Sequence, residues 1–189
     1  MENALIVSSK EKTTDLFTEM LNEVSFKQIT VTKSAGEARR LCLEKDFDLV
    51  IVNSPLLDEY GESLSRHIVS NSLSQVILAV KSELFNTIAA VCEEDGILNI
   101  SKPVNKEVFW SALSLAKSAR NRIKRIQAEN ALLKQKIEDI RIIDRAKFML
   151  ISCLNLSEQE AHRLIEKQAM DLRVSKRVIA EGVLKTYAN

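Results

Sequence analysis

The side chains best suited to hold a polyanion lie in the last third of the chain. Arginine offers a planar fork of donors to phosphates and base edges, and lysine offers a point charge. Histidine and glutamine can contact unpaired bases by stacking or by edge hydrogen bonds. We take the following side chains as candidate contacts with nucleic acid: Arg141, Arg145, Lys147, His162, Gln168, Arg173, Lys176 and Arg177. The basic ones do not follow the apolar period of the segment, so we expect them outside its core, whereas His162 is equally well explained as a partly buried core histidine.

The net charge of +1 conceals an asymmetry between the two parts of the chain. Residues 1–119 contain 12 lysines and arginines and 17 acidic residues, a balance of −5. Residues 120–189 contain 15 and 9, a balance of +6. A basic half is typical of a protein that meets a polyanion, and the alternative is an ordinary solvated helix surface.

Short apolar runs alternate with amphipathic stretches from residue 4 to residue 116. The runs are Ala4–Val7, Gln28–Val31, Asp48–Val52, Val76–Val80 and Ile97–Ile100. Continuous apolar strands separated by helices predict an α/β fold, a doubly wound, flavodoxin-like, five-stranded parallel sheet. Ser34 and Glu37 predict a capping box at the start of a helix over 37–44. The functional site of such a sheet lies at the carboxyl ends of its strands.

This lobe resembles the receiver domain of two-component signal transduction. The resemblance rests on FDLVIVN at 47–53, on Pro55, on DEYG at 58–61 and on SKPV at 101–104. A working receiver needs an acceptor aspartate after the third strand, two acids after the first strand to hold magnesium, a hydroxyl after the fourth strand and a lysine after the fifth. The resemblance assigns this pocket to Ser8, Ser9, Asn53, Val80 and Lys102.

The pocket therefore looks degenerate. An amide is too weak a nucleophile to form an acyl phosphate, and serines lack the anionic oxygens that a hard divalent cation prefers. We expect residues 1–117 to be a pseudo-receiver that is not phosphorylated. It would respond to a sensor protein or a small ligand, or serve as a fixed dimerisation and docking platform. Lys102 is either a residual conformational reporter or, with Pro103, merely closes the fifth strand.

A long helix is expected to follow, because no proline or glycine occurs between Pro103 and Gly182. Heptad spacing relates Ile123, Ile126, Asn130, Leu133, Ile137 and Ile140. A lone asparagine at an a position can pair with its copy across a parallel dimer and fix the register. Residues 118–140 are thus predicted to be a coiled-coil homodimerisation helix, and the alternative is a helix that packs against its own receiver lobe.

Three helices are expected in residues 137–189: the end of the connector, to about Cys153, then 157–173 and 175–187. Ser157 and Glu160 predict a capping box, and Ser175 can cap the third helix. The core is expected to include Ile143, Leu150, Ala161, Leu164, Ile165, Leu172, Val174, Val178 and Val183.

This segment resembles the ANTAR module, the three-helix RNA-binding output domain of bacterial antiterminators. The resemblance rests on Arg141, on DRAK at 144–147, on Leu150, on SEQEAH at 157–162, on Gln168-Ala169, and on Val178, Ala180 and Glu181. Together with the pseudo-receiver and the coiled coil, it implies a response regulator of the AmiR/NasT type. Such proteins bind paired hairpins in a nascent leader RNA and so prevent a terminator from forming. Phe148 departs from the family, which commonly has a small residue there; its bulk either packs inward or changes how RNA approaches.

Other classes of function fit less well. An enzyme is not expected, since His67 and His162 lie in different lobes and there is no glycine-rich phosphate loop. Neither a cofactor nor a metal site is expected, because the three cysteines lack close spacing and resemble small buried hydrophobes. Without a leader or a run of about 20 apolar residues, we expect a cytoplasmic protein without membrane contact. A DNA-binding response regulator and a protein-interaction adaptor remain as alternatives.

Overall fold

The computed structural model describes residues 1–24, 26–92 and 94–187. The chain divides into two compact units, Met1–Arg125 and Ile126–Asn189. Each unit has its own apolar core, and the helix α5, Lys106–Leu154, contributes to both.

The N-terminal unit is built on a parallel sheet. Its five strands are β1 (Asn3–Ser8), β2 (Gln28–Thr32), β3 (Leu49–Asn53), β4 (Gln75–Lys81) and β5 (Leu98–Lys102). They lie in the order β2-β1-β3-β4-β5, and every neighbouring pair is parallel. The predicted flavodoxin-like sheet is confirmed, with strand limits that differ from the predicted ones by one or two residues.

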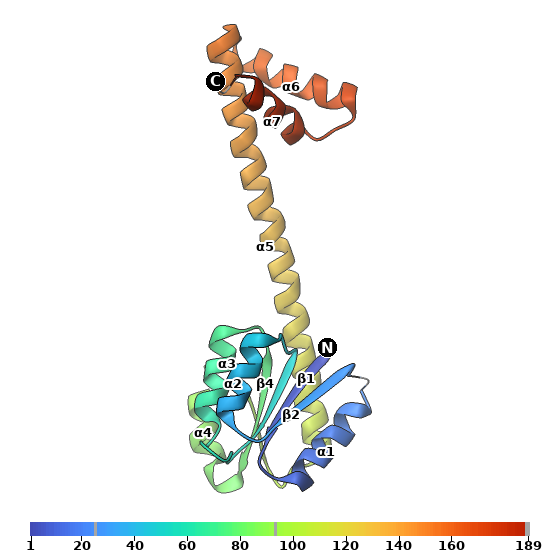
Figure 1. Cartoon of the computed structure of the whole chain (residues 1–189), viewed down its shortest axis with the longest axis vertical. Helices are drawn as coiled ribbons and strands as arrows, with labels where there is room; N and C mark the ends of the chain where they lie inside the picture. Colours follow the sequence, from blue (N-terminus) through green and yellow to red (C-terminus); the bar gives the residue numbers. More distant parts are fainter. Residues whose placement is uncertain (25, 93, 188–189) are drawn as a thin grey trace. The chain divides into compact units, whose positions relative to one another are not determined.

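Helices cover both faces of this sheet (Figure 1). One face packs on α2 (Ala35–Glu44), α3 (Glu62–Asn71) and α4 (Phe85–Cys92), and the other packs on α1 (Glu11–Asn22) and the start of α5. A short 3-10 turn, η1 (Ser82–Leu84), precedes α4. Because side chains alternate along a strand, Val50 and Val52 enter the first core while Leu49 and Ile51 enter the second. Double coverage explains why these strands are apolar without interruption.

The capping box predicted at α2 is only half formed. The Ser34 hydroxyl accepts a hydrogen bond from the Glu37 backbone N–H at 3.3 Å. The Glu37 carboxylate, however, accepts a hydrogen bond from the hydroxyl of Thr32, at the end of β2. Local spacing identified the cap, but the position of the neighbouring strand decided where the carboxylate went.

Arg120 fastens the N-terminal part of α5 to the receiver-like unit. This arginine is almost fully buried; its guanidinium pairs with the Asp48 carboxylate and donates to the backbone carbonyl of Leu73. Burial alone would raise the pKa of Asp48, but backbone donors at Glu2 and Asn3 together with Arg120 hold that pKa below its usual value. The charge of Arg120 is therefore used inside the first unit.

The C-terminal unit combines the end of α5 with α6 (Glu158–Leu172) and α7 (Lys176–Tyr187). The predicted capping box at Ser157 and Glu160 is present in full, and the Ser175 hydroxyl accepts a hydrogen bond from the N–H of Val178. The unit's buried core residues are Ala146, Leu150, Ala161, Ile165, Ala169, Ile179 and Ala180.

Three residues expected in this core are exposed instead, namely Leu172, Val174 and Val178. For Val178, the exposure follows from the phase of α7, which turns Ile179 and Ala180 inward and leaves Val178 52% exposed. Cys153 is also exposed, so the expectation of buried cysteines holds only for Cys92 in full. Among the described residues, no helix is both long and apolar enough to cross a membrane.

Candidate functional site

Two of the five residues assigned to the receiver pocket meet directly at the carboxyl edge of the sheet. Ser8 and Asn53 end the neighbouring strands β1 and β3 and are register partners. Both are about 1% exposed, and the Asn53 Nδ2 donates to the Ser8 Oγ at 2.9 Å. A neutral amide bonded to a neutral hydroxyl thus occupies the positions that the sequence resemblance assigns to the acids of a receiver.

The other three residues assigned to the pocket contact the segment after β3 or the apolar core. The Ser9 hydroxyl donates to the backbone carbonyl of Pro55 at 3.1 Å, and the Lys102 ammonium donates to the carbonyl of Ser54. Ser9 and Lys102 therefore both hold the segment that follows β3. Val80 is fully buried in the core beside α2, α3 and α4 and offers no polar atom.

Of the five residues assigned to the pocket, Lys102 alone carries an ionisable side chain, and none carries a carboxylate. Burial, together with the neighbouring ammonium groups of Lys10 and Lys81, lowers the pKa of Lys102 to about 8. Within the described part of the chain, the Asn53 Oδ1 is buried without a hydrogen-bond partner. Neutral oxygens beside a positively charged lysine are a poor donor set for Mg²⁺, which prefers carboxylates.

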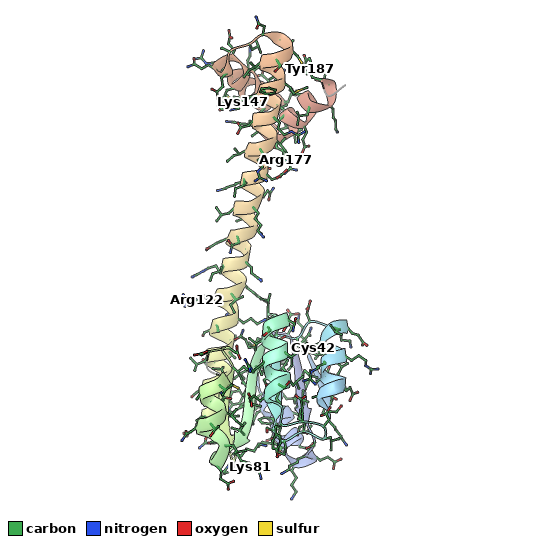
Figure 2. All side chains as sticks on the ribbon, turned by 90° about the vertical axis from the view of Figure 1, so that its left-hand side faces the viewer. Cys42, Lys81, Arg122, Lys147, Arg177 and Tyr187 are labelled. Carbon is green, nitrogen blue, oxygen red and sulfur yellow. The ribbon has the colours of Figure 1, made fainter. Side chains whose placement is uncertain are left out.

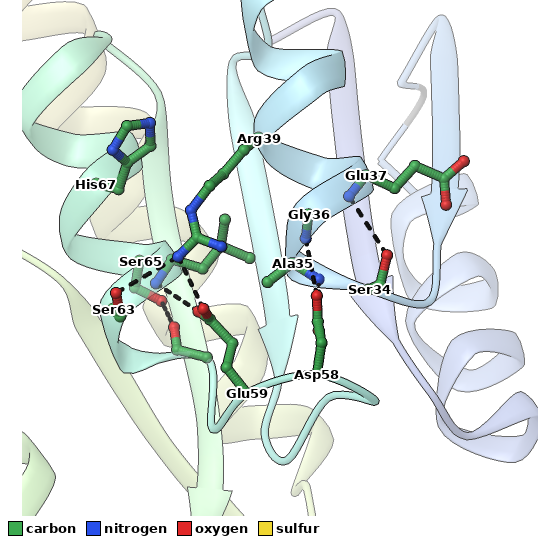
Figure 3. A network of polar contacts seen from close by, with 12 residues as sticks. Ser34, Ala35, Gly36, Glu37, Arg39, Asp58, Glu59, Ser63, Ser65 and His67 are labelled. Atoms are coloured by element: carbon green, nitrogen blue, oxygen red, sulfur yellow. Dashed lines mark hydrogen bonds and ion pairs between the residues drawn. The ribbon is translucent and has the colours of Figure 1, made fainter.

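The loop between β3 and α3 is held in one shape by two carboxylates (Figure 3). Asp58 accepts hydrogen bonds from the first two backbone N–H groups of α2, at 2.8 and 2.9 Å, and these bonds lower its pKa. Glu59 accepts from the N–H of Leu64 and pairs with Arg39, both at 2.8 Å. At Gly61, φ is +88° and an added Cβ would lie 2.7 Å from Val52, so only glycine fits there.

Most candidate cations of the C-terminal unit are paired within the unit. Lys147 contacts Asp144 at 2.7 Å and Glu158 at 3.4 Å. His162 lies 3.2 Å from the Glu166 carboxylate, which also pairs with Lys176. These contacts hold α5, α6 and α7 together as much as they offer charge to a ligand.

Arg177 is the most firmly held of these cations. Its guanidinium reaches Asp139 on α5 and Glu181 on its own helix α7, both at 2.8 Å. These hydrogen bonds raise its pKa. Lys147 and Arg177 can be followed on their helices in Figure 2.

The other candidates have few or no partners. Arg145 and Arg173 are exposed, and the described residues give neither of them a side-chain hydrogen bond or an ion pair. Arg141 has one weak contact, to Glu138 at 4.0 Å. Gln168 is exposed and lines a groove of about 450 Å³ with Thr186 and Tyr187. Among the candidate cations, those without a close partner in the described chain are therefore all arginines.

Sequence reasoning missed the acidic residues that decide which cations are free. The partners Asp144 and Glu166 lie three or four residues from Lys147 and His162 on one helix, a spacing that could have identified them. Asp139 lies 38 residues from Arg177, and no local signal relates the two.

Phe148 is the other residue of this unit whose place the spacing left open. Its ring is 68% exposed rather than packed inward.

The unit Ile126–Asn189 itself contains 11 lysines and arginines and 9 acidic residues, so its net charge is only +2. Much of the basic excess of residues 120–189 thus comes from residues 120–125.

The heptad residues of α5 form an apolar series without a partner in the described chain. Ile126, Leu133, Ile137 and Ile140 are each between 44% and 57% exposed. Asn130, also exposed, interrupts the series on the same helix.

Both units of the chain resemble known proteins. Residues 131–184 match the family model of the ANTAR domain. PdtaR, a transcriptional regulatory protein of Mycobacterium tuberculosis, is 24% identical over 168 residues, which are 89% of this chain and 82% of PdtaR.

Solved structures match the N-terminal fold. The signal receiver domain of an HD domain-containing protein from Pseudomonas fluorescens is 21% identical, with a TM-score of 0.59, over 66% of this chain and 92% of that one. A response regulator receiver domain protein from Clostridium thermocellum is 18% identical, with a TM-score of 0.57, over 67% and 99%. The chain therefore joins an N-terminal unit with the receiver fold to a C-terminal segment, residues 131–184, that matches the ANTAR domain.

Proposed function

We propose that this protein is a transcription antitermination regulator that binds RNA through its ANTAR domain. A dimer would hold paired hairpin loops in a nascent leader RNA and so prevent an overlapping terminator from forming. The observation that carries this proposal is the ANTAR match over residues 131–184, combined with unpaired arginine side chains on the surface of that domain. The resemblance to PdtaR, a transcriptional regulatory protein, supports the same class of function.

The division between paired and unpaired cations suggests how the surface would work. Arg145 and Arg173 keep all their donors available for phosphates or base edges, and Arg141 keeps most of them. Lys147, Lys176 and Arg177 would have to share or exchange carboxylate partners in order to contact RNA. His162 and Gln168 would add base contacts at the exposed surface of α6.

Dimerisation would bring two such domains to two hairpins. The exposed apolar series of α5 supports a parallel pair of helices, because contact with a second copy would remove those side chains from water. Asn130 would fix the register by pairing with its counterpart.

The receiver-like unit would regulate without accepting a phosphoryl group. The neutral Ser8–Asn53 contact and the lack of acids among the assigned pocket residues support this reading. A sensor protein or a small ligand on this unit would then supply the signal, and the chain would act as a regulator rather than as an enzyme.

A binding experiment separates this function from its alternatives. The full chain is titrated against a two-hairpin leader RNA, the same RNA with scrambled loops, and duplex DNA of equal length. We expect tightest binding to the intact leader RNA and increased read-through when that RNA is transcribed past its terminator. Preference for the duplex would identify a DNA-binding regulator, and binding to none of the three would favour an adaptor.

Matched variants assign the contacts. Arg145→Gln should reduce the preference for the correct loop by on the order of 1–3 kcal/mol if a base-edge contact is lost, by analogy with readout in DNA. Arg173→Gln should weaken binding to all loops and change the logarithmic salt slope by about 0.7, as loss of one single-strand phosphate contact does. Lys167→Gln is the control, because this exposed lysine on α6 lies outside the candidate set.

A further inference from the structure

Phe148 lines a cavity on the surface of the ANTAR domain. The cavity has a volume of about 380 Å³ and is lined by Asp144, Arg145, Phe148, Met149 and Leu184. The first four residues come from α5 and the last from α7. This volume lies within the range of about 300–1,000 Å³ that is usual for small-molecule sites.

Packing within the chain does not account for the exposed ring. Phe148 is 68% exposed and is not part of the buried core of the unit. Nor does the heptad series explain it, because its next two positions after Ile140 are Asp144 and Lys147, which pair with each other at 2.7 Å. A charged pair at both a and d positions ends the apolar seam before Phe148.

The charge around the cavity favours an anionic occupant. Arg145 precedes Phe148 by three residues on the same helix face, and the described chain offers its guanidinium no partner. The carboxylate of Asp144 is already engaged by Lys147. The cavity thus combines an open aromatic ring, apolar walls and one free guanidinium, which are the groups that recognise a nucleobase and its phosphate.

We propose that one unpaired RNA base stacks on Phe148 in this cavity while Arg145 holds the phosphate or the edge beside it. This inference rests on the RNA-binding function proposed above and names the site that would read the loop. The C-terminal unit has only one other aromatic residue, Tyr187, which is partly buried. Phe148 is therefore the one exposed aromatic side chain among the described residues of this unit. A Phe side chain accepts any base by stacking, because every base has a flat aromatic face.

The test uses the full chain and a defined probe. Hairpins with randomised loops are selected on the unaltered protein, and the tightest binder is then synthesised with 2-aminopurine at one loop position at a time. Stacking on Phe148 should quench the fluorescence of one position upon binding. Phe148→Ala should abolish that quenching and weaken binding roughly 5- to 150-fold, the range for loss of one base–aromatic stack.

Further variants distinguish stacking from simple apolar contact. Phe148→Trp should bind at least as tightly as the parent, because it keeps an aromatic face. Phe148→Leu keeps apolar volume without a ring and should bind nearly as weakly as Phe148→Ala. Met170→Ala is the matched control, since Met170 is a 77% exposed apolar residue of α6 outside the cavity, and it should leave binding unchanged.

The outcomes separate failure of this inference from failure of the function. If the parent selects specific hairpins and Phe148→Ala binds them equally well, base stacking here is wrong while RNA binding stands. If no hairpin is selected, both proposals fail. If Phe148→Ala lowers the oligomeric state in light scattering and Phe148→Leu restores RNA binding, the ring contacts a second copy and the inference is wrong. Thermal unfolding of each variant establishes that the domain remains folded.

Discussion

Single residues decide where charge is available in this protein. Arg145 and Arg177 lie in the same small unit, yet one has no partner among the described residues and the other holds two carboxylates. At the sheet edge, Asn53 and Ser8 form a neutral hydrogen-bonded pair, and Lys102 lies half-buried near two other lysines. Whether a charged side chain at each site is available to a ligand thus depends on its neighbouring residues more than on its residue type.

Lys102 should give the protein a measurable pH dependence. The folded state lowers the pKa of Lys102 to about 8, below the ordinary value of about 10.4, so the unfolded state binds more protons between these two values. Stability should therefore increase as pH rises through this window, as the cost of keeping the buried ammonium charged is relieved. Urea unfolding at pH 7 to 10 should show Lys102→Met losing stability relative to the parent as pH rises. A difference between the two proteins that is constant with pH would contradict this assignment.

Arg177 should act in folding before it acts in binding. Arg177→Met removes the contacts to Asp139 and Glu181, so we expect a lower melting temperature of the C-terminal unit. Asp139→Asn should lower it in the same direction, with less than additive loss in the double variant. If Arg177 instead contacts phosphate directly, Arg177→Met would weaken RNA binding while Asp139→Asn would leave it unchanged or strengthen it. Calorimetry and RNA titration on the same samples decide between these roles.

At the scale of elements, α5 is the helix with a series of exposed apolar side chains that a second helix would cover. Its heptad residues are exposed over several turns, and the series ends at the Asp144–Lys147 pair. A helix with such a stripe gains stability by burying it against an equivalent stripe. The short α6 and α7 depend instead on capping and on the small core that they share with α5.

Asn130 should limit the dimer to one register. Asn130→Ile should raise the thermal stability of the coil, because an apolar side chain replaces a buried amide, and should also permit other registers or oligomers. Light scattering of parent and variant at tens of micromolar, a rough working range for weak association, measures this directly. A parent that is strictly monomeric at that concentration would show that the helix does not dimerise. Gln135→Ala, which changes an exposed residue at the f position, outside the a, d, e and g positions, provides the control.

At the scale of the whole molecule, the chain joins a unit with the receiver fold to a segment that matches the ANTAR domain. The fold of the first unit is confirmed by its strand order and by its similarity to receiver domains. The neutral Ser8–Asn53 pair in this unit predicts that it does not accept a phosphoryl group. Whatever controls the protein would then act through contact with this unit.

Treatment with acetyl phosphate and magnesium should leave the protein unmodified. The Asn53 amide cannot form an acyl phosphate, and the neutral oxygens of Ser8 and Ser9 do not attract Mg²⁺. Intact-mass measurement after incubation checks this expectation, with a receiver domain that retains its acids as the positive control for the reagent. A stable single phosphoryl adduct mapped to residues 1–117 would overturn it.

By itself, the sequence determined the elements of the fold. Unbroken apolar runs separated by amphipathic segments specified a parallel sheet covered on both faces, and the fixed spacing of Ser157 and Glu160 specified the start of α6. These signals are local, because strand and helix periodicity and capping involve residues only a few positions apart. The ANTAR resemblance was readable for the same reason, since its motif residues lie at fixed spacing in one segment.

Only the tertiary structure decided which of the candidate side chains are free to act. The Arg177–Asp139 pair joins residues far apart in the chain, and it exists because α7 packs on α5 at one particular rotation. The same rotation buries Ile179, exposes Val178 and places Leu184 at the cavity beside Phe148. Helix phase and packing are collective properties of three helices and one core, so no spacing within a single segment could determine them.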